Sequence, residues 1–131
     1  MATTYAILII DDEPNNVELI SILLEKYAPF SFQLSLTNTV ENALEMMSSK
    51  AFQIVFSDYK LPKVYGTDFI NSVADKRTQF ILCTAYDFKK FENDFNKPVY
   101  FLQKPIDIDI FKHMITHIYQ TLMAYEKDLI L

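Results

Sequence analysis

The chain has 131 residues, half of them hydrophobic, and carries a formal net charge of −5 at pH 7 with a pI of about 4.9. This length fits one domain with a sizeable core, and the composition excludes a largely disordered chain, while the acidic balance without a basic run argues against direct binding of nucleic acid. The N-terminal apolar run is too short for a signal peptide or a membrane span, and the single cysteine cannot form an internal disulfide, so we expect a cytoplasmic protein.

The first half of the sequence alternates apolar runs of strand length with segments of helical periodicity. Continuous apolar runs, typical of strands buried on both faces, predict strands over 5–10, 32–37 and 52–57. Helices are expected from Pro14 to Ala28, after Asn38, and from Gly66 to about Ala74. Asn38 and Glu41 have the spacing of a capping box. The helix that follows is expected to face inward with Val40, Ala43, Leu44 and Met47.

The second half continues the alternation with one irregular interval. Strands are expected over 79–84 and 99–103, and a long helix from Asp107. The interval between the two strands contains no glycine and is short. We expect one brief or irregular helix there, with Phe88, Phe91 and Phe95 on one face.

Five strands that alternate with helices predict an α/β fold with a parallel sheet and helices on both faces. Ligands of such sheets bind beyond the carboxyl ends of the strands. The polar residues at these ends are Asp11, Asp12, Asp58, Thr84 and Lys104.

Carboxylates gathered at one edge repel each other by roughly 4 kcal/mol per pair at about 4 Å and an effective dielectric of 20. A hard divalent cation bound by Asp12 and Asp58 would relieve this repulsion, with further neutralisation by Lys104. Asp58 would then be a carboxylate nucleophile for a phosphoryl group, whose oxygens would meet Thr84 and Lys104.

These residues, together with the stretch "DYKLPKVYG" from Asp58 to Gly66, "ILCTA" around Thr84 and "LQKP" before Pro105, resemble the receiver domain of response regulators. Receivers are the phosphoacceptor modules of two-component signalling, and the resemblance is to the chemotaxis-regulator type. It covers roughly residues 5 to 120. We therefore assign residues 1–120 to a receiver domain and 121–131 to an extension of its last helix. The family fold is a flavodoxin-like five-stranded parallel sheet of order 2-1-3-4-5.

The resemblance implies a role for each matched residue. Asp58 is the phosphoacceptor, and Thr84 and Lys104 assist the reaction. Thr84 and Phe101, three residues before Lys104, form the conformational switch. Mg²⁺ or Mn²⁺ is held by Asp11, Asp12, Asp58 and the backbone carbonyl of Lys60.

The loop after the acceptor also follows the family pattern. Leu61, Pro62 and Gly66 stand at the expected positions. Proline restricts the loop, and we expect Gly66, the only glycine, to adopt a backbone angle that other residues avoid.

The expected partners are a histidine kinase or phosphotransfer protein as phosphodonor and a protein that receives the signal, with neither nucleic acid nor membrane bound directly. A receiver catalyses only its own phosphorylation and dephosphorylation. The alternatives are a receiver fragment of a larger regulator or hybrid kinase, and a pseudo-receiver that only binds. A haloacid-dehalogenase-like phosphatase is disfavoured because Lys60 stands where that class has a second acid.

The last helix carries an apolar seam with alternating steps of three and four residues. Because the helix is longer than a strand, we expect the seam from about Leu122 onward to contact a partner, most simply a second copy of the chain. Leu129, Ile130 and Leu131 would otherwise be an exposed apolar end.

Two further features have modest interpretations. Cys83 lies in an apolar strand, which indicates an inert buried thiol. His113 and His117 share a face of the last helix, but no third ligand motif accompanies them, so a solvated or partner-facing surface is favoured over a metal site.

Overall fold

The computed structural model describes residues 3–130, except for the side chains of 129 and 130. Five parallel strands form one sheet in the order β2-β1-β3-β4-β5. This order and the all-parallel pairing confirm the predicted flavodoxin-like fold. The strands are β1 (Thr4–Ile10), β2 (Ser31–Thr37), β3 (Ile54–Asp58), β4 (Gln79–Thr84) and β5 (Tyr100–Gln103).

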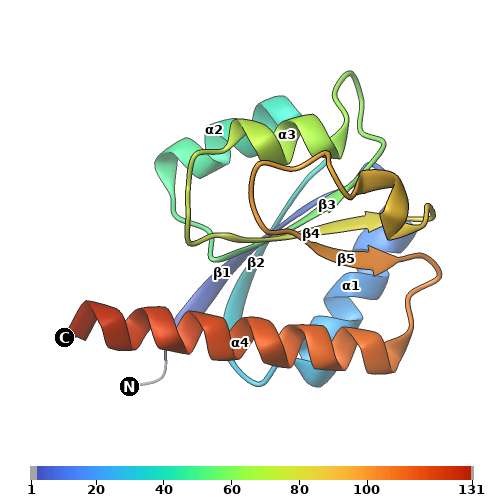
Figure 1. Cartoon of the computed structure of the whole chain (residues 1–131). Coiled ribbons are helices and arrows are strands. Elements are labelled where there is room, and N and C mark those ends of the chain that lie inside the picture. The colour runs from blue at the N-terminus through green and yellow to red at the C-terminus, as the bar shows by residue number, and fades with distance from the viewer. Residues whose placement is uncertain (1–2, 131) are drawn as a thin grey trace.

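Helices cover both faces of this sheet (Figure 1). Two of them, α1 (Pro14–Tyr27) and α4 (Ile108–Ile130), pack on one face. The other two, α2 (Val40–Ser49) and α3 (Gly66–Ser72), lie on the opposite face. A single 3₁₀ turn, η1 (Phe88–Phe91), follows β4 in place of a longer helix. No helix of the described residues is long and apolar enough to cross a membrane.

Strand β1, which lies between β2 and β3, explains the continuous apolar runs of the sequence. Tyr5, Ile7 and Ile9 belong to the core layer beneath α1 and α4. The residues that alternate with them, Ala6, Leu8 and Ile10, belong to the layer beneath α2 and α3. Because side chains alternate along a strand and both faces are covered, every position from 5 to 10 must be apolar.

The start of α2 differs from the prediction. The N-cap is Thr39, whose Oγ1 accepts a hydrogen bond from the backbone N–H of Asn42 at 3.2 Å. Asn38 therefore lies one residue outside the cap, and the predicted capping box with Glu41 is wrong. Leu44, predicted to face inward, is 41% exposed because it lies at the margin of the buried stripe.

The last helix stays in contact with its own domain further than the sequence indicated. Leu122 is 4% exposed and belongs to the core, and the Arg77 guanidinium lies 4.9 Å from the ring centre of Tyr125. The hydroxyl of Tyr5 donates to the carboxylate of Glu126 at 2.9 Å. The seam through Tyr125 thus faces the domain itself. The predicted end at Leu129, Ile130 and Leu131 lies outside the described side chains, and a homodimer stays a prediction.

Gly66 is required for a reason other than the predicted backbone angle. Its φ is not positive; the left-handed residue of this loop is Lys63, with φ of 69°. A Cβ on Gly66 would overlap the carbonyl oxygen of Asp58 and lie 3.0 Å from Ser57 Oγ. The glycine therefore allows α3 to start directly against the end of β3.

We predict that Gly66→Ala lowers the free energy of unfolding by about 1–3 kcal/mol, because the backbone of β3 cannot move away without disturbing the sheet. Lys63→Gly in the same loop should instead be neutral or stabilising, since glycine tolerates a positive φ. Urea denaturation of both variants measures the two changes. Equal stability of Gly66→Ala and the unchanged protein would contradict the steric explanation.

Candidate functional site

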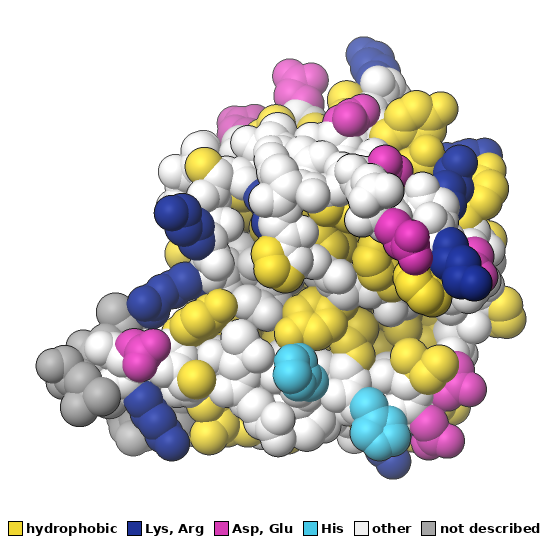
Figure 2. Space-filling view, in the orientation of Figure 1, with side chains coloured by type: hydrophobic (Ala, Val, Ile, Leu, Met, Phe, Trp, Pro, Cys, Tyr) yellow, Lys and Arg dark blue, Asp and Glu magenta, His cyan; other side chains and the backbone are white. Residues whose placement is uncertain are grey.

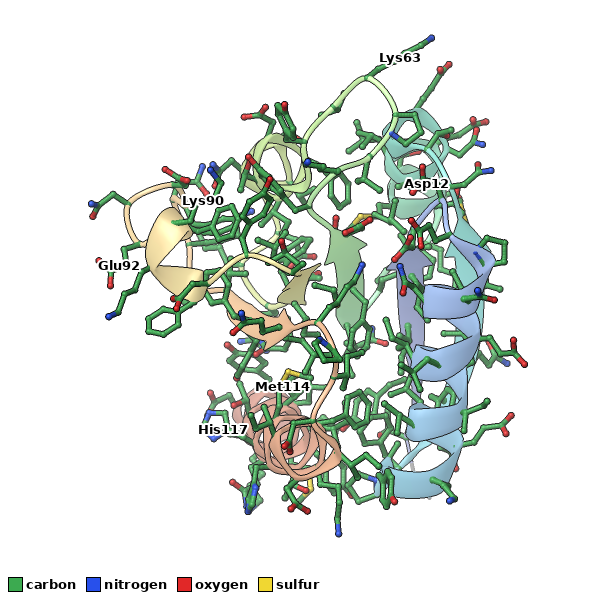
Figure 3. The ribbon with its side chains drawn as sticks, turned by 90° about the vertical axis from the view of Figure 1, so that its right-hand side faces the viewer. Asp12, Lys63, Lys90, Glu92, Met114 and His117 are labelled. Carbon is green, nitrogen blue, oxygen red and sulfur yellow. The ribbon has the colours of Figure 1, made fainter. Side chains whose placement is uncertain are left out.

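The predicted residues meet at one edge of the sheet. Asp11 and Asp12 directly follow β1, and Asp58 is the last residue of the adjacent β3. Thr84 ends β4, and Lys104 follows β5. Figure 3 shows this edge, with Asp12 near the start of α1, Lys63 on the loop after β3 and Lys90 on the turn η1.

Three carboxylates form the centre of the site. One oxygen atom from each of Asp11, Asp12 and Asp58 lies within 4.8 Å of the other two. Asp11 is buried, Asp58 is half-buried and Asp12 is exposed. A group of this kind fits Mg²⁺ or Mn²⁺, because hard cations take carboxylate oxygens and keep water ligands on an open side.

Lys104 is the cation of the site. Its Nζ donates to Asp58 Oδ1 at 3.2 Å and lies 3.7 Å from Asp11 Oδ2. Burial acts to lower the pKa of this ammonium, but the charges of Asp58 and Asp11 and the hydrogen bond to Asp58 together outweigh burial and raise the pKa. Lys104 therefore stays protonated and offsets one of the three negative charges.

Asp11 is the most constrained of the acids. Its Oδ1 accepts the backbone N–H of Glu13 at 2.9 Å, which fixes the turn between β1 and α1. Desolvation is the main cause that raises the pKa of this carboxyl; the Glu13 hydrogen bond and Lys104 oppose the rise, and Asp58 and Asp12 add to it. The ionised form of Asp11 is thus disfavoured by the fold itself.

The carboxylate of Asp58 is held by one oxygen. Its Oδ1 accepts the backbone N–H of Tyr59 at 2.8 Å as well as the Lys104 ammonium. Both hydrogen bonds that the described residues donate to this carboxylate end on Oδ1. The other oxygen, Oδ2, is left to bind a cation or to react.

Thr84 is buried at the end of β4, the strand next to β3. Its Oγ1 accepts the backbone N–H of Tyr86 at 3.2 Å, and its carbonyl oxygen accepts the backbone N–H of Lys104 at 2.8 Å. Since the hydroxyl accepts in the first contact, its proton can be donated to an oxygen that enters the site.

The rim of the site contains aromatic rings and lysines. Lys60 and Tyr86 stand two residues after Asp58 and Thr84, so the sequence placed this pair at the site, but it did not indicate the other members of the rim. The ammoniums of Lys60 and Lys90 lie 5.5 and 5.0 Å from the ring centre of Tyr86. Tyr59 meets Tyr86 edge-on at 5.8 Å and stacks on Tyr65 at 5.0 Å. The backbone carbonyl of Lys60 as a metal ligand stays a prediction.

Phe101 lies half-buried beneath η1. Its ring stacks on Phe91 at 6.0 Å and contacts Phe95 at 5.8 Å. The exposed ring of Phe88 lies 6.3 Å away. The preceding residue, Tyr100, faces the opposite core layer and meets His117 at 5.9 Å, as the alternation along a strand predicts. The switching role of Phe101 stays a prediction.

The cysteine and the histidines that the sequence analysis considered do not take part in the site. Cys83 is fully buried, and desolvation raises the pKa of its thiol to about 12, which leaves it unreactive. His113 is exposed on α4, and its Nδ1 donates to the carbonyl oxygen of Asp109 at 2.9 Å. Among the described residues, the one group of three potential metal ligands is the acidic cluster.

Comparisons with known proteins agree with this geometry. The family model of the response regulator receiver domain matches residues 7–116. No curated protein matches the chain.

Three solved structures illustrate the likeness of fold. A two-component transcriptional regulator AraC of Clostridium phytofermentans is 18% identical, with a TM-score of 0.79, over 95% of this chain and 98% of that one. A CheY-like receiver domain of Methylobacillus flagellatus is 23% identical, with a TM-score of 0.72, over 88% and 99%. The chemotaxis response regulator CheY4 of Vibrio cholerae is 18% identical, with a TM-score of 0.72, over 88% and 99%.

We predict that Asp11→Asn raises the free energy of unfolding at pH 7 when divalent cations are removed, by on the order of 1 kcal/mol. The pKa of Asp11 is raised by folding, so its ionisation destabilises the protein above that pKa, and the penalty disappears as the pH falls below the ordinary value for aspartate.

Urea denaturation at pH 7 and at low pH, with a chelator present, measures this effect. The variant and the unchanged protein should become equally stable at low pH. Asp94→Asn, a change at an exposed carboxylate on a loop, is the matched control and should have little effect. A lower stability of Asp11→Asn at pH 7 would show that its bonds to Lys104 and Glu13 outweigh desolvation.

Proposed function

Because the chain belongs to the response regulator receiver family, we propose that it accepts a phosphoryl group on Asp58 from a histidine kinase or phosphotransfer protein, in a Mg²⁺-dependent reaction, and signals through protein contacts. The observation that carries this proposal is the arrangement around Asp58. One of its oxygens is held by Lys104 and Tyr59, while the other has no donor among the described residues. Two more carboxylates lie close enough to share a cation with it.

The proposed reaction transfers one phosphoryl group. An oxygen of the Asp58 carboxylate forms a bond to phosphorus as the bond between phosphorus and the donor histidine nitrogen breaks, and that nitrogen keeps the electron pair. The products are an acyl phosphate on Asp58 and a neutral imidazole. A bound Mg²⁺ would neutralise charge on the phosphoryl oxygens.

The residues of the chain orient the group. Asp11 and Asp12, with Asp58, would hold the cation, and the buried Asp11 is fixed by its bond to Glu13. Lys104 would shift from Asp58 Oδ1 toward a phosphoryl oxygen as a point charge. Thr84 would donate its hydroxyl proton to another oxygen. The protein would catalyse only the phosphorylation and dephosphorylation of its own Asp58.

There are two alternatives to a phosphorylated stand-alone receiver, and we rank them lower. A pseudo-receiver would bind partners without phosphorylation, but the acids and Lys104 form a complete set. The same site would also serve a receiver that is part of a larger regulator or hybrid kinase, rather than a stand-alone protein. The length of the intact gene distinguishes a stand-alone receiver from one that is part of a larger protein.

We predict that Asp58→Asn abolishes phosphorylation while the fold persists, because the amide is close in shape but lacks the nucleophile and one charge for the cation. The measurement is labelling by a small phosphodonor with Mg²⁺, followed by mass spectrometry. Asp94→Asn should be labelled normally. Mg²⁺-dependent labelling of Asp58→Asn to the same extent would refute the assignment.

We predict slow hydrolysis of the acyl phosphate, because Lys60 and Tyr86 contact each other at the rim and crowd the approach of water. The double variant Lys60→Ala/Tyr86→Ala should shorten the phosphoryl lifetime by about tenfold, which corresponds to about 1.4 kcal/mol in the barrier. Decay of the labelled protein measures it, with Lys63→Ala as the control on the same loop. An unchanged lifetime would remove the basis for this prediction.

We predict that Phe101 changes rotamer on phosphorylation. Movement of Thr84 toward the phosphoryl group would vacate space beside β5, and the ring would exchange its exposed edge for that space. Crystal structures with and without beryllofluoride, a phosphoryl mimic, provide the measurement. A single Phe101 rotamer in both states would exclude the ring as the switch.

A further inference from the structure

A groove opens at the end of the sheet opposite the phosphoacceptor site. It lies between the segment that follows α3, the segment that enters β5, and the part of α4 around Thr121 and Tyr125. Its volume is about 880 Å³, which is within the usual range for small-molecule sites. On this face of the molecule, hydrophobic side chains are exposed between the upper layer and α4, and cationic side chains lie both to the left and to the right of them (Figure 2).

The groove exists because no helix covers this end of β4 and β5. After η1 the chain runs without regular structure to β5, and it is fastened to α3 instead. The side chain of Asn71 donates to the carbonyl oxygen of Asp94 at 2.7 Å and accepts the backbone N–H of Asn96 at 2.9 Å. Asn96 in turn donates its side chain to the carbonyl oxygen of Asn71 at 3.1 Å. These bonds hold one wall of the groove in place.

The walls combine apolar surface with an ammonium group. Val73, Val99 and Tyr125 are partly buried and offer apolar contacts. The Nζ of Lys97 donates to the carbonyl oxygen of Val73 and lies 5.0 Å from the ring centre of Phe80. Desolvation lowers the pKa of this ammonium, and the charge of Asp75 offsets part of that effect.

Lys97 has no carboxylate partner among the described residues. Both ion pairs of the described chain belong to Lys104 at the other end of the sheet. Asp75 is the acid of the groove lining, but its Oδ1 is engaged by the backbone N–H groups of Arg77 at 2.7 Å and Thr78 at 3.0 Å. A second ammonium, Lys76, also lines the groove. The lining thus has a local excess of positive charge in a protein with a net charge of −5.

We propose that this groove binds a small organic anion with an apolar body. The anionic group would pair with Lys97, where partial burial strengthens a charge-assisted hydrogen bond. The apolar body would lie against Val73, Val99 and Tyr125. Neither feature involves Asp58, so this site is independent of the proposed phosphorylation.

The test uses two fluorescent probes that share one skeleton. Anilinonaphthalene sulfonate carries an apolar body and an anionic group, whereas phenylnaphthylamine has the same rings without the sulfonate. We expect saturable binding of the sulfonate at a ratio of one per chain, and binding of the neutral probe that is about tenfold weaker. Equal binding of both probes would overturn the role of the charge.

Two variants locate the binding. Lys97→Met keeps an apolar stem over Phe80 but removes the ammonium, and it should weaken sulfonate binding about tenfold with little effect on the neutral probe. The matched control is Lys50→Met, since the Lys50 ammonium lies 5.4 Å from the ring centre of Phe52 but outside the groove. Sulfonate binding to the control should be unchanged, and an equal loss in both variants would overturn the assignment to Lys97.

A third variant keeps the test valid if Lys97→Met unfolds. Ala74 is exposed and lines the groove, so Ala74→Trp should fill it without disturbing the core. Filling should abolish saturable binding, although it adds apolar surface. Undiminished binding to this variant would show that the probe attaches non-specifically and would overturn the proposal. Asp58→Asn should bind the sulfonate normally, which separates this result from any failure of the proposed phosphorylation.

Discussion

The parallel sheet forces three carboxylates and one ammonium into the same small space. Asp11, Asp12 and Asp58 cannot separate, because the hydrogen-bond register of β1 and β3 sets where both strands end. Lys104 offsets one charge, and its own backbone N–H is fixed by the carbonyl oxygen of Thr84. A negative excess therefore persists, and it suits the site for a divalent cation. Under the proposed function, that cation would also neutralise charge on the incoming phosphoryl group.

The sequence predicted the sheet and its polar edge because both depend on strong local signals. Strands buried on two faces must be apolar throughout, as β1 is, and a carboxylate at the end of such a strand is conspicuous. Details that depend on tertiary contact were not predictable. The choice of Thr39 over Asn38 as N-cap shifts a helix by one residue, and the exposure of Leu44 depends on where α2 lies over the sheet. The aromatic rim around Tyr86 joins loops far apart in sequence.

The region after β4 confirms the expected brief and irregular helix, because the chain forms one 3₁₀ turn, η1, and then a loop before β5. The phenylalanines of that interval do share a cluster with Phe101, as their spacing indicated, but they reach it from one 3₁₀ turn and a loop. A connection without a longer helix cannot bury all of its phenylalanines, and Phe88 is exposed. The aromatic rings pack on Phe101 within β5, whereas the start of β5, at Tyr100, lines the groove. Two different surfaces thus flank one edge strand.

The presence of a single glycine, Gly66, also has a consequence for the unfolded chain. Glycine has the greatest backbone entropy of any residue, and this chain contains only one. Its loops are made by residues with narrower conformational freedom, including Lys63 in a left-handed conformation. The denatured ensemble therefore has fewer accessible backbone states than that of a glycine-rich chain of the same length, and the chain loses less entropy when it folds.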